Sequence, residues 1–135
     1  MEFISAEEFL KQPEKVQKAL KDWFKDNIEL YDLYTTIEYS DVIIIRNDKQ
    51  IKAIKEYGIK DNVIPLFTEG QLRKFIEDET KYKMEIYIND KKYMIMLCKW
   101  EYFQYQTDKD NLLEAYWEVA CKIIAEKYKY GIVFP

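Results

Sequence analysis

The chain has 135 residues and a net charge of −4; 48% of its residues are hydrophobic and 34% are charged. This composition is too apolar for a disordered chain, and the length suits one domain with a real core, which we expect over residues 1–135. Acidic and basic residues are interleaved and the isoelectric point is about 5.0, so a protein that grips a nucleic-acid polymer through a basic face is disfavoured.

The first residues, MEFISAEEFLKQ, lack the basic and apolar regions of a secretory signal. No apolar run approaches the ~18 residues that a membrane span needs. Cys98 and Cys121 lie in apolar segments, without the spacing of a metal site or a disulfide framework. We therefore expect buried, reduced thiols in a cytoplasmic protein that does not contact membranes.

The N-terminal region has the pattern of two helices. Ser5 and Glu8 have the spacing of a capping box, and Pro13 suits the first position of a longer helix. The apolar residues after Pro13 recur at helical spacing, which predicts a surface helix docked on a core, with a partner-binding helix as the alternative. Its apolar stripe consists of Val16, Ala19, Leu20, Trp23 and Phe24, and we expect Trp23 to be buried against a sheet.

The next region changes character. Residues 28–46 are rich in β-branched and aromatic side chains, which predicts one or two strands, the segment 41–46 being the more buried. Ile51 and Ile54 then favour a short helix, capped by Asp48 and stopped by Gly58.

A central helix follows an extended apolar run. Thr68 and Gln71 form a second capping box, and the buried face of the helix consists of Leu72, Phe75 and Ile76. Acidic residues crowd its C-terminal end, where the helix dipole disfavours negative charge. We expect a compensating lysine among Lys74, Lys81 and Lys83.

The C-terminal half carries the clearest strand pattern. From Met84 to Ile88 the apolar residues alternate with Glu85 and Tyr87, and Asn89-Asp90 then marks a tight turn. A second strand follows, in which Tyr93, Ile95 and Leu97 alternate with Met94, Met96 and Cys98, and a third strand spans residues 100–106. A long helix begins near residues 108–110 and stops at Gly131, before an apolar tail, IVFP, that folds back or contacts a partner. The residues expected on its buried stripe are Leu113, Tyr116, Trp117, Ala120, Cys121 and Ile124.

These elements predict an α+β fold. We expect a small antiparallel sheet of three to five strands, packed on one face by the N-terminal helix, the central helix and the long C-terminal helix.

Little catalytic chemistry is available to this sequence. The chain has no histidine, which removes histidine-based triads, histidine-bound zinc and the usual general base near neutral pH. Three glycines cannot build a dinucleotide-binding or Walker-type loop, and no metal or other cofactor is expected. We therefore predict a protein that is not an enzyme, with a small enzyme that uses carboxylates as an alternative.

Gly70 raises a separate question, because glycine is rare here and this one lies in the first turn of the central helix. A tight approach to the helix that leaves no room for a Cβ is the favoured interpretation. The alternative is a site where a phosphate meets the free amides of the helix start, with Arg73 as its partner. Glu69 opposes this alternative, because its charge already satisfies the helix dipole.

The tyrosines of the predicted sheet raise a similar choice. Core packing under the helices is favoured, whereas exposed tyrosines would indicate protein contact or stacking on nucleobases. The residues concerned are Tyr87, Tyr93, Tyr102 and Tyr105. A sponge for a small nucleotide would combine Gly70, Arg73, Tyr87 and Tyr102.

Three segments, FISAEEFLKQPEKVQKALKDWFK, IPLFTEGQLRKFIED and NLLEAYWEVACKII, resemble segments of small phage and prophage proteins of Firmicutes, especially clostridia. The resemblance implies a phage accessory protein in the cytoplasm of a bacterial host, and transfers no catalytic residue. By analogy, we expect a non-enzymatic inhibitor that binds a host protein, plausibly a component of anti-phage defence. The sponge for a nucleotide immune signal is the alternative, and the sequence does not indicate an oligomeric state.

Overall fold

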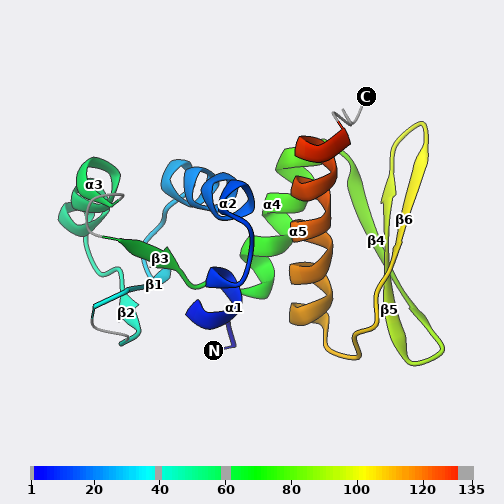
Figure 1. Ribbon diagram of the computed structural model, residues 1–135, viewed down its shortest axis with the longest axis horizontal. Coiled ribbons are helices and arrows are strands. Elements are labelled where there is room, and N and C mark those ends of the chain that lie inside the picture. The colour runs from blue at the N-terminus through cyan, green and yellow to red at the C-terminus, as the bar shows by residue number, and fades with distance from the viewer. Residues whose placement is uncertain (1, 39–40, 59–61, 131–135) are drawn as a thin grey trace. The chain divides into compact units, whose positions relative to one another are not determined.

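The computed structural model describes residues 2–38, 41–58 and 62–130, with side chains up to residue 127 (Figure 1). It confirms the α+β class. The chain forms two compact units: the N-terminal unit, residues 5–67, and the C-terminal unit, residues 68–135 together with residues 1–4. Their organisation as one domain stays a prediction.

The N-terminal unit combines three helices with a small sheet. The sheet has the antiparallel order β2-β1-β3, with Leu33 opposite Ile44 and Thr35 opposite Ile64. Its elements are α1 (Ala6–Leu10), α2 (Glu14–Asp26), β1 (Leu33–Thr36), β2 (Ile43–Ile44), α3 (Asp48–Tyr57) and β3 (Val63–Pro65).

Local sequence signals place the helices of this unit. The Ser5 hydroxyl accepts the Glu8 N–H at 3.2 Å and begins α1, as predicted. Pro13 is the residue just before α2 rather than its first position. The apolar stripe of α2 is buried in the unit core, where the Trp23 ring lies 6.2 Å from the ring of Phe67.

Two further predictions for the N-terminal unit need correction. Asn47, not Asp48, caps α3, because its side-chain oxygen accepts the Gln50 N–H at 2.9 Å. The strand expected to be more buried, β2, is only half-buried, whereas β1 carries the buried Leu33 and Thr35. Gly58 is the C-cap of α3, as predicted.

The C-terminal unit contains a three-stranded meander and two helices, α4 and α5. The two helices pack against each other. Its elements are α4 (Glu69–Thr80), β4 (Lys83–Asn89), β5 (Lys92–Cys98), β6 (Tyr102–Gln106) and α5 (Leu112–Tyr130). Within the described residues, the strands thus form two three-stranded antiparallel sheets, not the one sheet that the sequence suggested.

The capping box predicted for α4 is present. The Gln71 side chain accepts the Thr68 N–H at 3.0 Å, and Leu72, Phe75 and Ile76 are fully buried. The acids at its end find partners that the sequence did not indicate: Glu79 is 3.1 Å from Lys127 of α5, and Glu77 is 3.2 Å from Arg73.

The long helix α5 begins at Leu112, where the Asn111 side chain accepts the Glu114 N–H at 3.1 Å. Its predicted apolar stripe is buried, including Trp117, except that Cys121 is only half-buried. The predicted stop at Gly131 and the tail lie outside the described residues. Among the residues described, no helix is long and apolar enough to cross a membrane.

Candidate interaction surface

The sheet of the C-terminal unit has two different faces, which the strand register defines. On one face, the core face, Met84 lies beside Leu97 and Phe103, and Ile86 lies beside Ile95 and Tyr105. The helix α5 packs on this face, since the Tyr105 hydroxyl donates to a Glu126 carboxylate oxygen at 3.1 Å.

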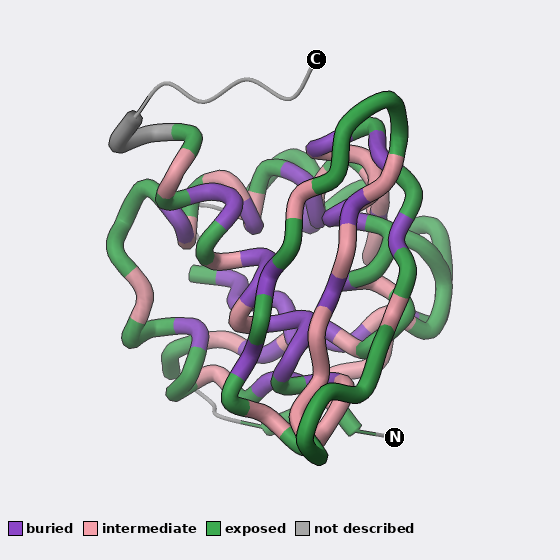
Figure 2. The backbone as a smooth tube through the Cα atoms, turned by 90° about the vertical axis from the view of Figure 1, so that its right-hand side faces the viewer, coloured by how far each residue is buried: buried purple, intermediate pink, exposed green. Residues whose placement is uncertain are grey.

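Alternate residues of the same strands form the opposite face, which we call the open face. Figure 2 looks onto this sheet, with its outer strands largely exposed and its middle strand partly buried. By the pairing register, the open face consists of Lys83, Glu85, Tyr87, Asn89, Lys92, Met94, Met96, Cys98, Tyr102, Gln104 and Gln106.

The centre of the open face is apolar and partly accessible. The middle strand contributes Met94, Met96 and Cys98, all half-buried. Tyr87 and Tyr102 flank this row from the two outer strands and are 44% and 69% exposed. Sheet faces that no other element covers usually carry polar residues. A partly accessible row of two methionines between exposed tyrosines is therefore typical of a surface that binds another molecule.

Glu85 organises the polar groups of the open face. The Tyr87 hydroxyl donates to a Glu85 carboxylate oxygen at 2.5 Å, and this hydrogen bond, strengthened by the Glu85 charge, raises the pKa of Tyr87. Burial raises the pKa of the Cys98 thiol, and the Glu85 charge adds to the effect. A thiol with a raised pKa carries less thiolate at neutral pH, so Cys98 is not an activated nucleophile.

The structure corrects the sequence interpretation of Cys98, which was expected in the core. Cys98 alternates with Ile95 and Leu97 along β5 and therefore lies on the open face. Both cysteines are free thiols, and burial raises the pKa of Cys121 to about 12.

The predicted core packing of the sheet tyrosines holds for only part of the set. Tyr105 is buried and Tyr93 is half-buried on the core face, whereas Tyr87 and Tyr102 lie on the open face. Both faces of β5 are apolar, so the sequence pattern did not show which face the helices cover.

The residues proposed for a nucleotide site do not come together. Gly70 and Arg73 are on α4, and α4 packs with α5, which covers the core face of the sheet. Tyr87 and Tyr102 lie on the opposite face. The Arg73 guanidinium is already paired with Glu77 at 3.2 Å.

Gly70 is not explained by tight packing, and that interpretation is wrong. Gly70 is exposed, and a Cβ built on it meets no heavy atom within 4 Å outside its own helix turn and chain neighbours. Its φ lies outside the left-handed region. No steric reason in the structure requires glycine at this position.

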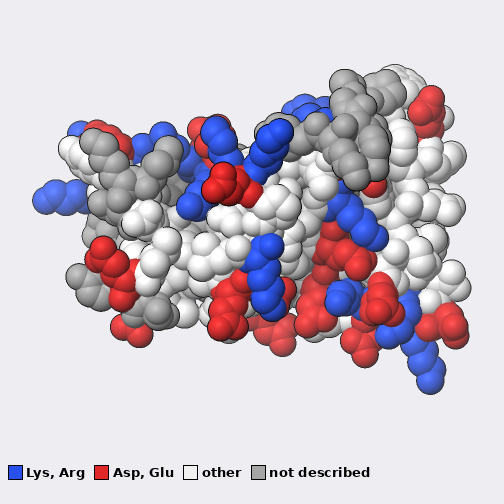
Figure 3. All heavy atoms as spheres, in the orientation of Figure 1, with Lys and Arg blue, Asp and Glu red and all other residues white. Residues whose placement is uncertain are grey.

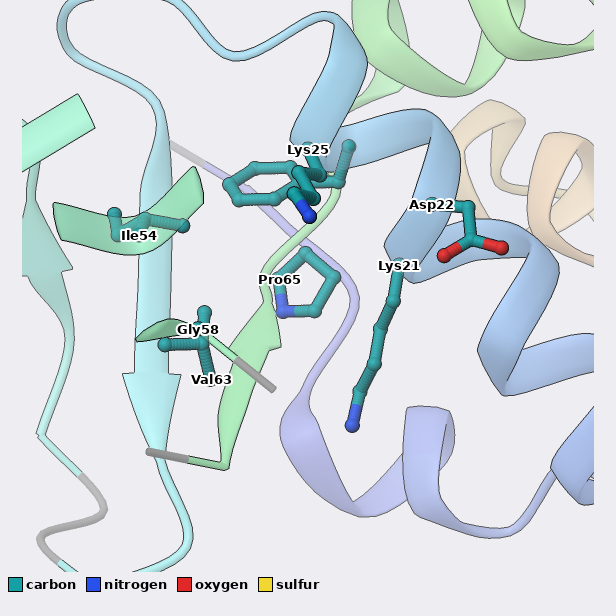
Figure 4. Close-up of a pocket in the computed structure, with 8 residues that line it drawn as sticks. Lys21, Asp22, Lys25, Ile54, Gly58, Val63 and Pro65 are labelled. Carbon is teal, nitrogen blue, oxygen red and sulfur yellow. The ribbon is translucent and has the colours of Figure 1, made fainter. Parts of the chain in front are cut away.

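A small pocket lies in the N-terminal unit (Figure 4). Its walls come from α2, through Lys21 and Phe24, from the end of α3, through Ile54 and Gly58, and from β3, through Pro65. The space open to the centre of a water molecule is about 30 Å³, whereas one bound water needs roughly 10–15 Å³ by the same measure. This pocket is too small for a nucleotide base or a metabolite of similar size.

A larger, shallow groove of about 500 Å³ lies at the end of the C-terminal sheet. Some of its polar groups pair with one another: the Asn89 amide donates to Gln106 at 3.3 Å, and Lys92 is 3.9 Å from Asp108. Lys122 and Glu118 form a further pair at 3.8 Å. No group of three or more potential metal ligands occurs among the described residues.

Charge does not single out a surface on the face of the molecule that Figure 3 shows. Figure 3 shows acidic and basic side chains intermixed on the visible face, as the interleaved sequence suggested. The open face is therefore the best candidate for function. No protein-family model matches the chain, and neither a curated protein nor a solved structure matches it.

Proposed function

We propose that this protein acts by binding another protein through the open face of its β4-β5-β6 sheet. The observation that carries the proposal is the row of Met94, Met96 and Cys98 between the exposed Tyr87 and Tyr102. Tyrosine and methionine are enriched at the centres of protein interfaces, and charged residues are depleted there.

The arrangement of polar residues suits the same role. Lys83, Glu85 and Lys92 border the apolar row, so the face has the apolar centre and polar rim of a protein interface.

The nature of the partner rests on the resemblance of three sequence segments to phage and prophage proteins. On that basis, the partner is a protein of a bacterial host, such as a component of anti-phage defence. Binding inhibits this partner in the host cytoplasm without catalysis. The raised pKa of Cys98 supports a binding role over cysteine chemistry.

The nucleotide sponge is the weaker candidate. Tyr87 and Tyr102 offer rings for stacking, but nucleotides also need a cationic or amide-rich phosphate site. The cation proposed for that role, Arg73, is paired with Glu77 and lies on a helix away from the open face.

A photocrosslinking experiment tests the proposal. Tyr102 is replaced by p-benzoylphenylalanine in the full chain, which is expressed in a bacterial host and irradiated. Tyr57 carries the same replacement as a matched control, because it is also an exposed tyrosine, 52% accessible, at the end of α3. We expect a discrete protein adduct from position 102 and none from position 57.

Affinity measurements with the captured protein complete the test. Tyr102→Ala should weaken binding by about tenfold or more, as truncation of a central interface tyrosine does, while Tyr57→Ala leaves it unchanged. Adducts of equal yield at both positions, or affinity that is insensitive to Tyr102→Ala, would contradict the proposal. Nucleotide released from the heated protein, with no protein adduct, would favour the sponge instead.

A further inference from the structure

The strand β6 forms one edge of the C-terminal sheet, and two hydrogen bonds show which of its backbone groups face outward. The Lys99 N–H donates to the Glu101 carbonyl at 3.1 Å, and the Thr107 N–H donates to the Tyr93 carbonyl at 3.0 Å. Residues of an antiparallel strand alternate between its two neighbours, so odd-numbered residues here face β5. Tyr102, Gln104 and Gln106 therefore direct their N–H and C=O groups away from the sheet.

This edge lacks the features that usually prevent strands from pairing between molecules. Such features are charged side chains, prolines and bulges. The sequence of β6, YFQYQ, has no charge and no proline, and its register with β5 runs without a break over five residues. The other edge strand, β4, carries the exposed Lys83 and Glu85. By this contrast, only the β4 edge of the sheet carries charged side chains that hinder pairing with another strand, and we call it the guarded edge.

We infer that β6 pairs with β6 of a second copy of this chain, in antiparallel orientation, about a two-fold axis at Gln104. The three outward residues would then form the hydrogen-bonded pairs of the new ladder. Gln104 faces Gln104 of the partner subunit, and Tyr102 faces Gln106 of the partner subunit. The result is a dimer with one continuous six-stranded sheet.

The composition of β6 favours a second copy over a charged peptide. Because the strand is neutral, self-pairing places no like charges opposite each other, and a charged partner strand would gain nothing from it. On the open face, Gln104 meets Gln104 of the partner subunit and Tyr102 meets Gln106 of the partner subunit. On the core face, Phe103 meets Tyr105 of the partner subunit, an aromatic cross-strand pair of the type that stabilises sheets.

This inference goes beyond the proposed function and does not depend on it. The open face is a face of the sheet, whereas the dimer uses the backbone edge. Pairing would join two open faces side by side, so each dimer would present two copies of the methionine and tyrosine row.

Sedimentation equilibrium of the full chain tests the inference. One chain has a mass of 16.5 kDa, so a dimer has twice 16.5, or 33.0 kDa. We expect the dimer mass at micromolar concentration. Gln104→Pro removes an outward N–H, and an edge strand tolerates proline at such a position, so this variant should sediment as a folded monomer.

Charges at the two-fold axis give a sharper test. Gln104→Lys and Gln104→Glu each place two like charges opposite each other, and each should weaken the dimer by about tenfold or more. Mixed in equal amounts, the two variants should form a heterodimer, because the charges are then opposite. Ile88→Lys, at an exposed position of β4 on the guarded edge, is the matched control and should leave the dimer intact.

Two results would overturn the inference. One is a wild-type chain that remains monomeric at about 100 μM, far above the dissociation constant of a stable dimer. The other is a dimer that persists in both Gln104→Pro and Gln104→Lys, which would place the contact elsewhere. Neither result affects the crosslinking test of the open face, which is read from adducts with a different protein.

Discussion

Gly58 and Gly70 differ in the space available for a Cβ atom. This difference predicts that an alanine substitution changes the free energy of unfolding in opposite directions at the two positions. A Cβ at Gly58 would overlap the carbonyl oxygen of Ile54, whereas a Cβ at Gly70 meets nothing. Gly70→Ala should raise the free energy of unfolding by about 0.4–1 kcal/mol, because alanine restricts the unfolded chain without strain in the folded one. Gly58→Ala should lower it by more than about 1 kcal/mol. Urea denaturation of the two variants measures both changes.

The Gly70 variant also bears on the anion alternative. If Gly70→Ala proved destabilising, some contact at the start of α4 would be needed to explain it. Lys74→Ala, an exposed substitution on the same helix, serves as the reference for a change that only alters the surface.

The environment of Cys98 predicts how its reactivity responds to a single charge. The Glu85 charge helps to raise the Cys98 pKa, so Glu85→Gln should lower that pKa and increase the thiolate fraction at a given pH. A maleimide reagent near pH 7 should therefore label Cys98 faster in Glu85→Gln than in the wild type. The Cys121 labelling rate in the same samples is the internal control, since only burial raises its pKa. Equal rates for Cys98 in both proteins would contradict the interaction.

At the scale of single elements, α5 carries the clearest prediction. Trp117 is buried on the helix stripe that the sequence indicated. Trp117→Ala should lower the free energy of unfolding by about 3–5 kcal/mol, as truncation of a large core side chain does. Trp100→Ala provides the comparison, because Trp100 is highly exposed and its loss should change stability by less than about 0.5 kcal/mol. A melting temperature of Trp117→Ala equal to that of the wild type would refute the placement.

Elements were predictable where the signal is local. The capping residues Ser5 and Thr68 and the helical stripe around Trp117 identify helices because they involve neighbours within a few turns. The alternation from Met84 to Ile88 identified a strand for the same reason.

What the sequence did not show depends on contacts between distant segments. The pairing of β1 with β3 and of β4 with β5 separates the strands into two sheets, and no local pattern encodes that division. Likewise, β5 is apolar on both sides, so only packing decides that Ile95 is covered and Met96 remains partly accessible. The candidate surface, the open face, therefore became evident only once the packing showed which side of β5 the helices cover.

At the scale of the whole molecule, the titrating groups predict a loss of stability at alkaline pH. Burial is the main cause that raises the pKa values of Tyr82, Tyr105, Tyr116 and Cys121 in the folded chain. Above about pH 9 the unfolded chain releases protons that these groups retain when folded. Because the folded state then binds more protons, the free energy of unfolding falls as pH rises. All four groups belong to the C-terminal unit, so this unit should weaken first.

Urea denaturation near pH 7 and near pH 10.5 measures this loss, and Tyr105→Phe identifies one source of it. The variant loses the hydrogen bond to Glu126 and should be less stable at neutral pH, but it also loses a titrating group. Its deficit relative to the wild type should therefore shrink at alkaline pH. Tyr57→Phe, at an exposed tyrosine, should show no such change. A Tyr105→Phe deficit that stays constant across pH would contradict the assignment.

The two methionines of the open face affect how selective that surface can be. Met94 and Met96 are unbranched and adopt many rotamers, so the relief of the surface can adjust to ligands of different shape while the backbone stays in register. A face of this kind is intrinsically permissive, as promiscuous methionine-rich surfaces are. Discrimination between partners must then come from the charged border of the open face. There, Lys83 and Glu85 repel a partner that places a like charge opposite either of them.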